Sequence, residues 1–260
     1  MNTPIVESRR TILACIALAG AVAIALLSLA SVARGGDAKA QGAKTDALYP
    51  HSIKLTDGKT AHWAVLMRRT VVRAKPGLAS RVITTLPTGT TDGTQTDVLV
   101  LSRIDLSPTS SWYRVRLPIL PNNTTGFVRK RDLSPLFTVH THLFINRGAL
   151  TATLQRYGKV VFKTRVGVGK SYWPTPRGEF YVRDKLTNFN NPFYGPLAFG
   201  ISARSAVLTD WPGGGYVGIH GTNEPQLIPG YISHGCIRMR NASILALSRL
   251  MPVGTPVSIR

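Results

Sequence analysis

The sequence predicts a mainly β protein with two β-rich domains and one short helix near the C-terminus. Short runs of β-branched and aromatic residues recur from residue 61 to the end of the chain, and Gly, Pro and Asn separate them. A helical pattern appears only near residues 241–250. With 260 residues, of which 43% are hydrophobic, the chain is long enough to bury a substantial core.

Residues 1–33 are predicted to be a targeting segment. Arg9 and Arg10 precede a nearly continuous apolar run, which at about 20 residues is long enough to cross a bilayer. Ser31-Val32-Ala33 supplies the small residues of a cleavage site, so a signal peptide and an uncleaved signal anchor both fit. Either form exports the rest of the chain to the periplasm or cell wall, with a membrane attachment if the segment is uncleaved.

Residues 34–60 are polar and Gly- and Ala-rich, and predict a flexible tether. Residues 61–135 then predict a small β-barrel, because five short strands without an amphipathic helix are expected there, at 70–73, 81–86, 97–101, 112–117 and 126–128. The order of its turn and aromatic motifs resembles a bacterial SH3-like domain: Val72-Arg73-Ala74-Lys75-Pro76-Gly77, Leu86-Pro87-Thr88-Gly89-Thr90, Trp112-Tyr113-Arg114-Val115 and Thr125-Gly126-Phe127-Val128. Such modules bind wall peptides or hold a neighbouring catalytic domain, and both roles stay open.

Residues 137–260 are predicted to form the second domain. A β meander is expected first, followed by further strands, with the meander at 142–146, 152–157 and 159–169 and the later strands at 180–182, 216–220 and 256–259. Residues 188–200 are expected to be a loop whose bulky aromatic side chains cover a cleft. The helix is predicted to start with Asn241 as its N-cap and to carry Arg249 near its C-terminal end.

The charge of the chain indicates an anionic environment. Lys and Arg number 32 against 12 Asp and Glu, a formal net charge of +20, which attracts polyanions. The basic residues are spread along the chain, and no zinc-finger spacing or RNA-binding aromatic signature accompanies them. An anionic cell envelope is therefore favoured over nucleic acid, which is not expected as a partner.

The cysteines point to a thiol site. Cys15 lies in the N-terminal apolar run, so a mature exported chain would contain Cys236 alone, without a disulfide partner. A single Cys is compatible with a small buried hydrophobe or with a reactive thiol. Near neutral pH a neighbouring imidazole is the usual activator of a nucleophilic thiol, and His220 and His234 are the candidates. His220, which arrives from another strand, is better placed than His234, which shares a tight turn with Cys236.

The turn around Gly235 predicts an oxyanion hole. A residue without a Cβ lets the backbone bring consecutive N–H groups together, so the N–H groups of Gly235 and Cys236 are the expected donors, with His234 as a further contributor. Zinc binding is a weaker alternative, because one Cys and two His leave Glu224 as the only nearby acid for a fourth ligand. No metal or other cofactor is expected.

Two motifs of the second domain resemble the L,D-transpeptidase catalytic domain (YkuD family) over residues 137–260. They are His220 followed by Ser233-His234-Gly235-Cys236, and the upstream Pro174-Thr175-Pro176-Arg177-Gly178-Glu179-Phe180. The resemblance implies that Cys236 is the nucleophile, that His220 is its general base and that the Gly221 carbonyl orients the imidazole. It also implies that Ser233, His234 and Gly235 shape the oxyanion and acceptor side of the site.

One position departs from a common form of the motif. Arg238 stands where that form has Asn, and two roles are open for it: binding a substrate carboxylate or bracing the turn.

The reaction implied by the resemblance is a two-step acyl transfer in cell-wall synthesis. Cys236 forms a thioester with a donor peptidoglycan stem peptide, and an acceptor stem amine then takes the acyl group to give a 3→3 cross-link. An L,D-carboxypeptidase with the same chemistry is an alternative, in which water accepts the acyl group. A non-catalytic cell-wall-binding protein is an alternative of another class.

Overall fold

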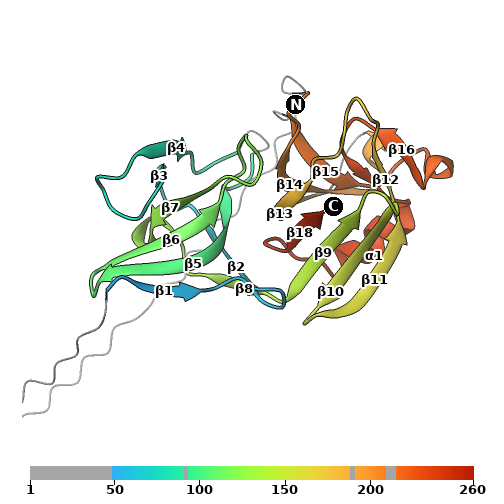
Figure 1. Cartoon of the computed structure of the whole chain (residues 1–260). Helices are drawn as coiled ribbons and strands as arrows, with labels where there is room; N and C mark the ends of the chain where they lie inside the picture. The colour runs from blue at the N-terminus through green and yellow to red at the C-terminus, as the bar shows by residue number, and fades with distance from the viewer. Residues whose placement is uncertain (1–48, 91–92, 188–190, 209–214) are drawn as a thin grey trace, which may run out of the picture. The chain divides into compact units, whose positions relative to one another are not determined.

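The computed structural model describes residues 49–90, 93–187, 191–208 and 215–260 (Figure 1). The predicted targeting segment at 1–33 and most of the expected tether lie outside these residues. Within the described ranges the chain forms eighteen strands and one α-helix, which confirms the mainly β fold class. None of the helical segments in those ranges has the length and apolar character that a bilayer crossing requires.

The first sheet is antiparallel, with the strand order β4-β3-β7-β6-β5-β2-β8 and β1 paired with β5. Its strands are β1 (His51–Lys54), β2 (Ala61–Val65), β3 (Thr70–Arg73), β4 (Val82–Leu86), β5 (Asp97–Ser107), β6 (Ser110–Arg116), β7 (Thr125–Arg129) and β8 (Phe137–Val139). All five strands expected between 61 and 135 are present. The tether expected over 34–60 is wrong for residues 51–54, because they form β1 and pair with β5. Likeness to an SH3 domain stays a prediction.

The second sheet has the order β11-β10-β9-β18-β13-β14-β15-β17-β12-β16. Its strands are β9 (Thr141–Asn146), β10 (Thr151–Arg156), β11 (Lys159–Arg165), β12 (Gly167–Gly169), β13 (Gly178–Thr187), β14 (Leu197–Arg204), β15 (Tyr216–His220), β16 (Gly230–Ser233), β17 (Ile237–Arg238) and β18 (Pro256–Ile259). The antiparallel meander β9-β10-β11 is as predicted.

The single strand expected over 159–169 is two strands, because β12 leaves the meander and pairs with β16 and β17 instead. Gly167 lies close to β16 in this pairing, and a Cβ there would lie 2.5 Å from the side chain of Ile232, which would have to move. The loop expected over 188–200 is also shorter, because β14 begins at Leu197 and pairs with both β13 and β15.

The predicted N-cap role of Asn241 is wrong. The helix α1 (Asn241–Ser248) begins at this residue and is preceded by Arg240, which makes no side-chain capping bond. The Asn241 Oδ1 instead accepts a hydrogen bond of 2.9 Å from the backbone N–H of Thr222. Arg249 follows the last helical residue as the C-cap.

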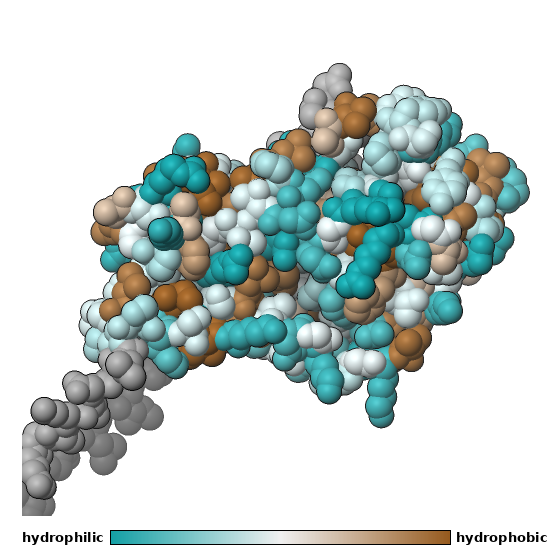
Figure 2. All heavy atoms as spheres, viewed as in Figure 1, coloured by the Kyte–Doolittle hydropathy of each residue, from teal (hydrophilic) through white to brown (hydrophobic). Residues whose placement is uncertain are grey.

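The core of the second sheet is closed by α1. Ile244 and Leu247 of the helix are fully buried among residues of β13, β14, β15 and β17. Burying large apolar side chains in this way is the main favourable contribution to folding. On the face drawn in Figure 2, hydrophobic residues occur in small groups between hydrophilic ones.

The two sheets share a further small core within the compact unit Asp46–Arg260. Tyr181 of β13 is fully buried there, and its hydroxyl donates a 2.9 Å hydrogen bond to the carbonyl of Asp97 in β5. The side chain of Asn122 bonds both backbone groups of Arg204, at 2.7 and 2.9 Å. Because Arg204 ends β14, the loop between β6 and β7 braces the strand next to β15, which carries His220.

Candidate active site

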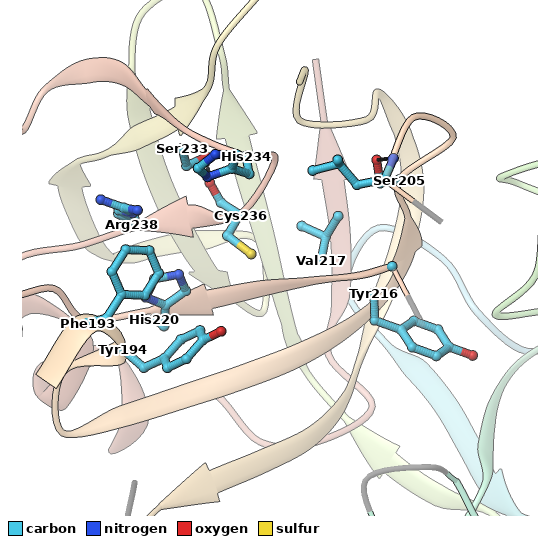
Figure 3. A pocket seen from close by; sticks show the side chains of 12 residues that line it. Phe193, Tyr194, Ser205, Tyr216, Val217, His220, Ser233, His234, Cys236 and Arg238 are labelled. Atoms are coloured by element: carbon cyan, nitrogen blue, oxygen red, sulfur yellow. Dashed lines mark hydrogen bonds between the residues drawn. The ribbon is translucent and has the colours of Figure 1, made fainter. Parts of the chain in front are cut away.

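One pocket of the second sheet brings together most of the predicted site residues (Figure 3). Cys236, His220, Ser233, His234 and Arg238 all line it, although they come from β15, β16, β17 and the turn between the last two. The aromatic side chains on its other walls are Phe193, Tyr194 and Tyr216. Gly221 follows His220 directly at the end of β15.

His220 is held between two strands by backbone pairing, opposite Ala198 of β14 and Arg238 of β17. It is 1% exposed, and its Nδ1 lies 2.6 Å from the carbonyl oxygen of Gly221. A carbonyl can only accept, so we assign the ring hydrogen to Nδ1 and the lone pair to Nε2. Nε2 has no hydrogen-bond partner among the described residues. It is therefore the nitrogen that can receive a proton.

Burial sets the charge of this imidazole. Loss of solvent lowers the pKa of His220 from 6.5 to about 4; the Gly221 carbonyl opposes this effect and the Arg238 charge adds to it. The rings of Tyr194 and Phe193, with centroids 5.0 and 5.9 Å from that of His220, form part of the surroundings. At neutral pH His220 is uncharged and competent as a base.

Cys236 is a free, half-buried cysteine in the turn after β16. Its Sγ accepts a 3.4 Å hydrogen bond from the backbone N–H of Gly218 in β15. Burial raises the pKa of the Cys236 thiol, while the Gly218 N–H and the Arg238 charge act in the opposite direction. The raised pKa of the thiol and the lowered pKa of the imidazole both favour the neutral forms of these two side chains in the pocket.

Ser233 organises the turn that carries the cysteine. Its hydroxyl donates a 2.6 Å hydrogen bond to the carbonyl of Cys236 and accepts one of 3.1 Å from the N–H of Gly235. Gly235 has a φ of +119°, which a residue with a Cβ rarely adopts. Of the two N–H groups expected to donate to an oxyanion, that of Gly235 is bonded to the Ser233 hydroxyl in this structure. The Cys236 N–H has no acceptor among the residues that the structure describes.

The rings of His234 and His220 have different neighbours. Its ring lies on that of Trp173, with a centroid distance of 4.0 Å. Desolvation and the nearby Lys170 charge lower the pKa of His234. This tilted ring contact places His234 against Trp173 and favours His220 as the partner of the thiol.

Arg238 makes bracing contacts. It is buried, its Nη1 lies 2.9 Å from the Glu224 carboxylate, and its guanidinium lies 4.2 Å from the ring centroid of Phe193. These contacts favour the bracing role over direct capture of a substrate carboxylate. Glu224, the candidate fourth zinc ligand, is engaged by this ion pair. Within the described ranges no three His, Cys, Asp or Glu side chains cluster in a way that could hold a metal ion.

Three contributors to the site were not identified from the sequence as site residues. Gly218 acts through its backbone N–H, which leaves no side-chain signal. Asn241 bonds the backbone beside Gly221, but its sequence position resembles an N-cap. Thr175 is buried, and its hydroxyl lies 2.8 Å from both Gly169 N and the Gly235 carbonyl. In the sequence, Thr175 could have been identified through the upstream motif at 174–180, which contains it.

Sequence comparison with known proteins identifies the family of the second domain. The sequence profile of the L,D-transpeptidase catalytic domain (YkuD) matches residues 140–259. The YkuD protein of Bacillus subtilis (strain 168), assigned by name to the L,D-transpeptidases, is 35% identical over 123 residues, covering 47% of this chain and 68% of that relative. The YkuD protein of Bacillus licheniformis is 34% identical over 122 residues, covering 47% of this chain and 67% of its own length.

Among solved structures, a crystal structure of a mutant Enterococcus faecium L,D-transpeptidase aligns with a TM-score of 0.38 and 25% identity, covering 46% of this chain and 49% of that one. The sequence matches place the motifs around His220 and Cys236 in a shared catalytic domain. The chain belongs to the L,D-transpeptidase (YkuD) family.

Proposed function

We propose that this chain is a cysteine-dependent acyltransferase that forms 3→3 cross-links between peptidoglycan stem peptides. One observation carries the proposal: Cys236 shares a pocket with His220, whose Nδ1 is bound to the Gly221 carbonyl and whose basic Nε2 lacks a partner among the described residues. A thiol and an oriented imidazole of this kind form the pair that nucleophilic acyl transfer requires.

The first step makes the thioester. As Sγ of Cys236 attacks the carbonyl carbon of the third residue of the donor stem, the thiol proton passes to Nε2 of His220. The carbonyl oxygen becomes an oxyanion and accepts a hydrogen bond from the Cys236 N–H. When the intermediate collapses, the C–N bond breaks and the imidazolium returns the proton to the leaving D-Ala amine.

The second step transfers the acyl group. The amine of an acceptor stem attacks the thioester carbon, His220 takes the proton from the attacking nitrogen, and the C–S bond breaks. The proton then returns to sulfur, which regenerates the thiol. If water attacks instead, the product is a free tripeptide and the activity is that of an L,D-carboxypeptidase. Neither step requires a metal or other cofactor.

The charge and the N-terminal sequence fit work in the cell envelope. A formal charge of +20 suits substrates that carry free carboxylates within an anionic wall. The apolar segment before residue 34 would deliver the chain to the periplasm or wall, and would keep it at the membrane if uncleaved.

Mass spectrometry of the products from purified disaccharide-tetrapeptide tests the proposal. A dimer that has lost one D-Ala is the expected product, and Cys236→Ala is expected to form none. Release of a tripeptide alone would replace transfer by hydrolysis. An unchanged substrate would favour the non-catalytic wall-binding alternative.

The base is tested separately by alkylation of the thiol. We expect His220→Ala to slow the reaction of Cys236 with iodoacetamide, because the proton acceptor is lost. His234→Ala is the matched comparison, and its alkylation rate is expected to stay within about twofold of wild type. The reverse pattern would move the base to His234.

A further inference from the structure

The segment Trp173-Pro174-Thr175 lies directly against the turn between β16 and β17, which carries Cys236. The ring of Trp173 covers His234, and a Cβ placed on Gly235 would be 3.6 Å from the carbonyl oxygen of Pro174. The same segment approaches Gly169 of β12 so closely that a Cβ on that glycine would be 2.5 Å from the backbone nitrogen of Thr175. The segment is therefore fixed between β12 on one side and the turn on the other.

The Thr175 hydroxyl connects these two neighbours. Thr175 is 1% exposed, and its Oγ1 accepts a 2.8 Å hydrogen bond from the N–H of Gly169. The hydroxyl hydrogen is then donated to the carbonyl of Gly235, also at 2.8 Å. Both directions are unambiguous, since an N–H only donates and a carbonyl only accepts. A buried hydroxyl satisfied on both sides has no freedom to rotate.

Gly169, which donates to the Thr175 hydroxyl, is itself held by β16. Gly169 pairs in parallel with Ser233 of β16, and the N–H of Lys170 donates a 3.0 Å hydrogen bond to the Ser233 carbonyl. The Thr175 hydroxyl therefore holds the Gly235 carbonyl in a fixed position relative to the second sheet.

Fixing the Gly235 carbonyl also fixes the N–H of Cys236. The two groups belong to one planar trans peptide, in which the C=O and N–H point in opposite directions. Ser233 holds the next peptide in the same manner, because its hydroxyl bonds the carbonyl of Cys236. The peptide groups before and after the cysteine Cα are therefore both held, the first by Thr175 and the second by Ser233.

We propose that Thr175 is a positioning residue that aims the Cys236 N–H at the oxyanion formed during acyl transfer. Thr175 acts through the Gly235–Cys236 peptide and does not line the pocket around the thiol. The inference rests on the proposed acyl transfer. It goes beyond that proposal by assigning a function to the hydroxyl of the upstream motif.

Two reactions of the same thiol test this role. Acyl transfer passes through an oxyanion, whereas alkylation by iodoacetamide attacks a saturated carbon and forms none. Thr175→Val keeps the branched shape but removes the hydroxyl. We expect it to slow acylation by disaccharide-tetrapeptide about 10- to 100-fold, the scale of a displaced catalytic group, and to leave the alkylation rate within about twofold.

Conservative and matched variants complete the design. Thr175→Ser retains the hydroxyl and is expected to acylate within about threefold of wild type. Thr70→Val removes another buried threonine hydroxyl, in the first sheet, and is expected to leave both rates unchanged. If Thr175→Val does not fold, Thr175→Ala replaces it, since its smaller side chain leaves room for water to reach the two backbone groups.

The outcomes separate the two proposals. Equal slowing of acylation and alkylation in the Val or Ala variant would show that the hydroxyl only stabilises the turn, and would overturn the positioning role. Wild-type acylation rates in those variants would overturn it as well. Absence of acyl transfer by the wild-type protein would overturn the proposed function itself, and the positioning role with it.

Discussion

Protonation of the buried His220 is expected to make the folded protein sensitive to acid. The pKa of His220 is about 4 in the folded chain against 6.5 in a solvated one, and burial is the main cause. Between these two pH values the unfolded chain binds more protons than the folded chain. Stability therefore falls as the pH drops through this window, with the full contribution present above 6.5 and lost by about 4.

The magnitude follows from the difference between the two pKa values. At about 1.4 kcal/mol for each pH unit, the interval between the two pKa values corresponds to about 3 kcal/mol of unfolding free energy. No reduction for solvent screening applies, because His220 is 1% exposed. A loss of this size is a large fraction of the stability of a typical domain.

Urea unfolding of the wild type and of His220→Gln at pH 7.5, 5.5 and 4.0 measures this contribution. The Gln side chain does not titrate, and the other histidines are common to both proteins, so their contributions cancel in the comparison. We expect the wild type to lose about 3 kcal/mol more than the variant between pH 7.5 and pH 4.0. Equal losses in the two proteins would refute the buried neutral state of His220.

Two further predictions concern the surroundings of the thiol. Arg238→Lys keeps the charge but loses the planar contact with Phe193, and we expect it to lower acyl transfer about tenfold and the unfolding free energy by about 1 kcal/mol. The exposed Arg249→Lys is its control, and equal effects of both changes would argue against the bracing role. Gly235→Ala must adopt a φ of +119°. We expect the free energy of unfolding, measured in urea, to fall by about 1–3 kcal/mol and acyl transfer to become slower. A variant as stable as wild type would show that this backbone conformation does not strain a residue with a Cβ.

The strands predicted most accurately from the sequence were short runs bounded by turn-forming residues. The strands β3, β4 and β7 lie within about one or two residues of their predicted bounds, because local pattern and tertiary burial agree there. β5 continues to Ser107, well beyond residue 101, since its polar second half is stabilised by pairing with β1 and β6. That pairing depends on distant segments and leaves no local signal.

The residues of the candidate site also divide into those with a local sequence signal and those without one. Cys236 and His220, which line one pocket, could be predicted because the expected chemistry requires particular side chains in a recognisable order. The contacts of Gly218 and Asn241 depend on the approach of separate strands, so no local pattern contains them. The acceptor of the Gly235 N–H could have been anticipated, because a serine hydroxyl two residues earlier commonly bonds such an N–H.

The thioester on Cys236 is the most direct test of the proposed mechanism. Intact-protein mass spectrometry after rapid mixing with disaccharide-tetrapeptide would detect it as an added mass equal to the substrate minus D-Ala. Peptide mapping is expected to place the adduct on Cys236, and an acceptor stem should remove it with formation of the cross-linked dimer. Cross-linking by the Cys236→Ala protein, or an adduct on another residue, would contradict the mechanism.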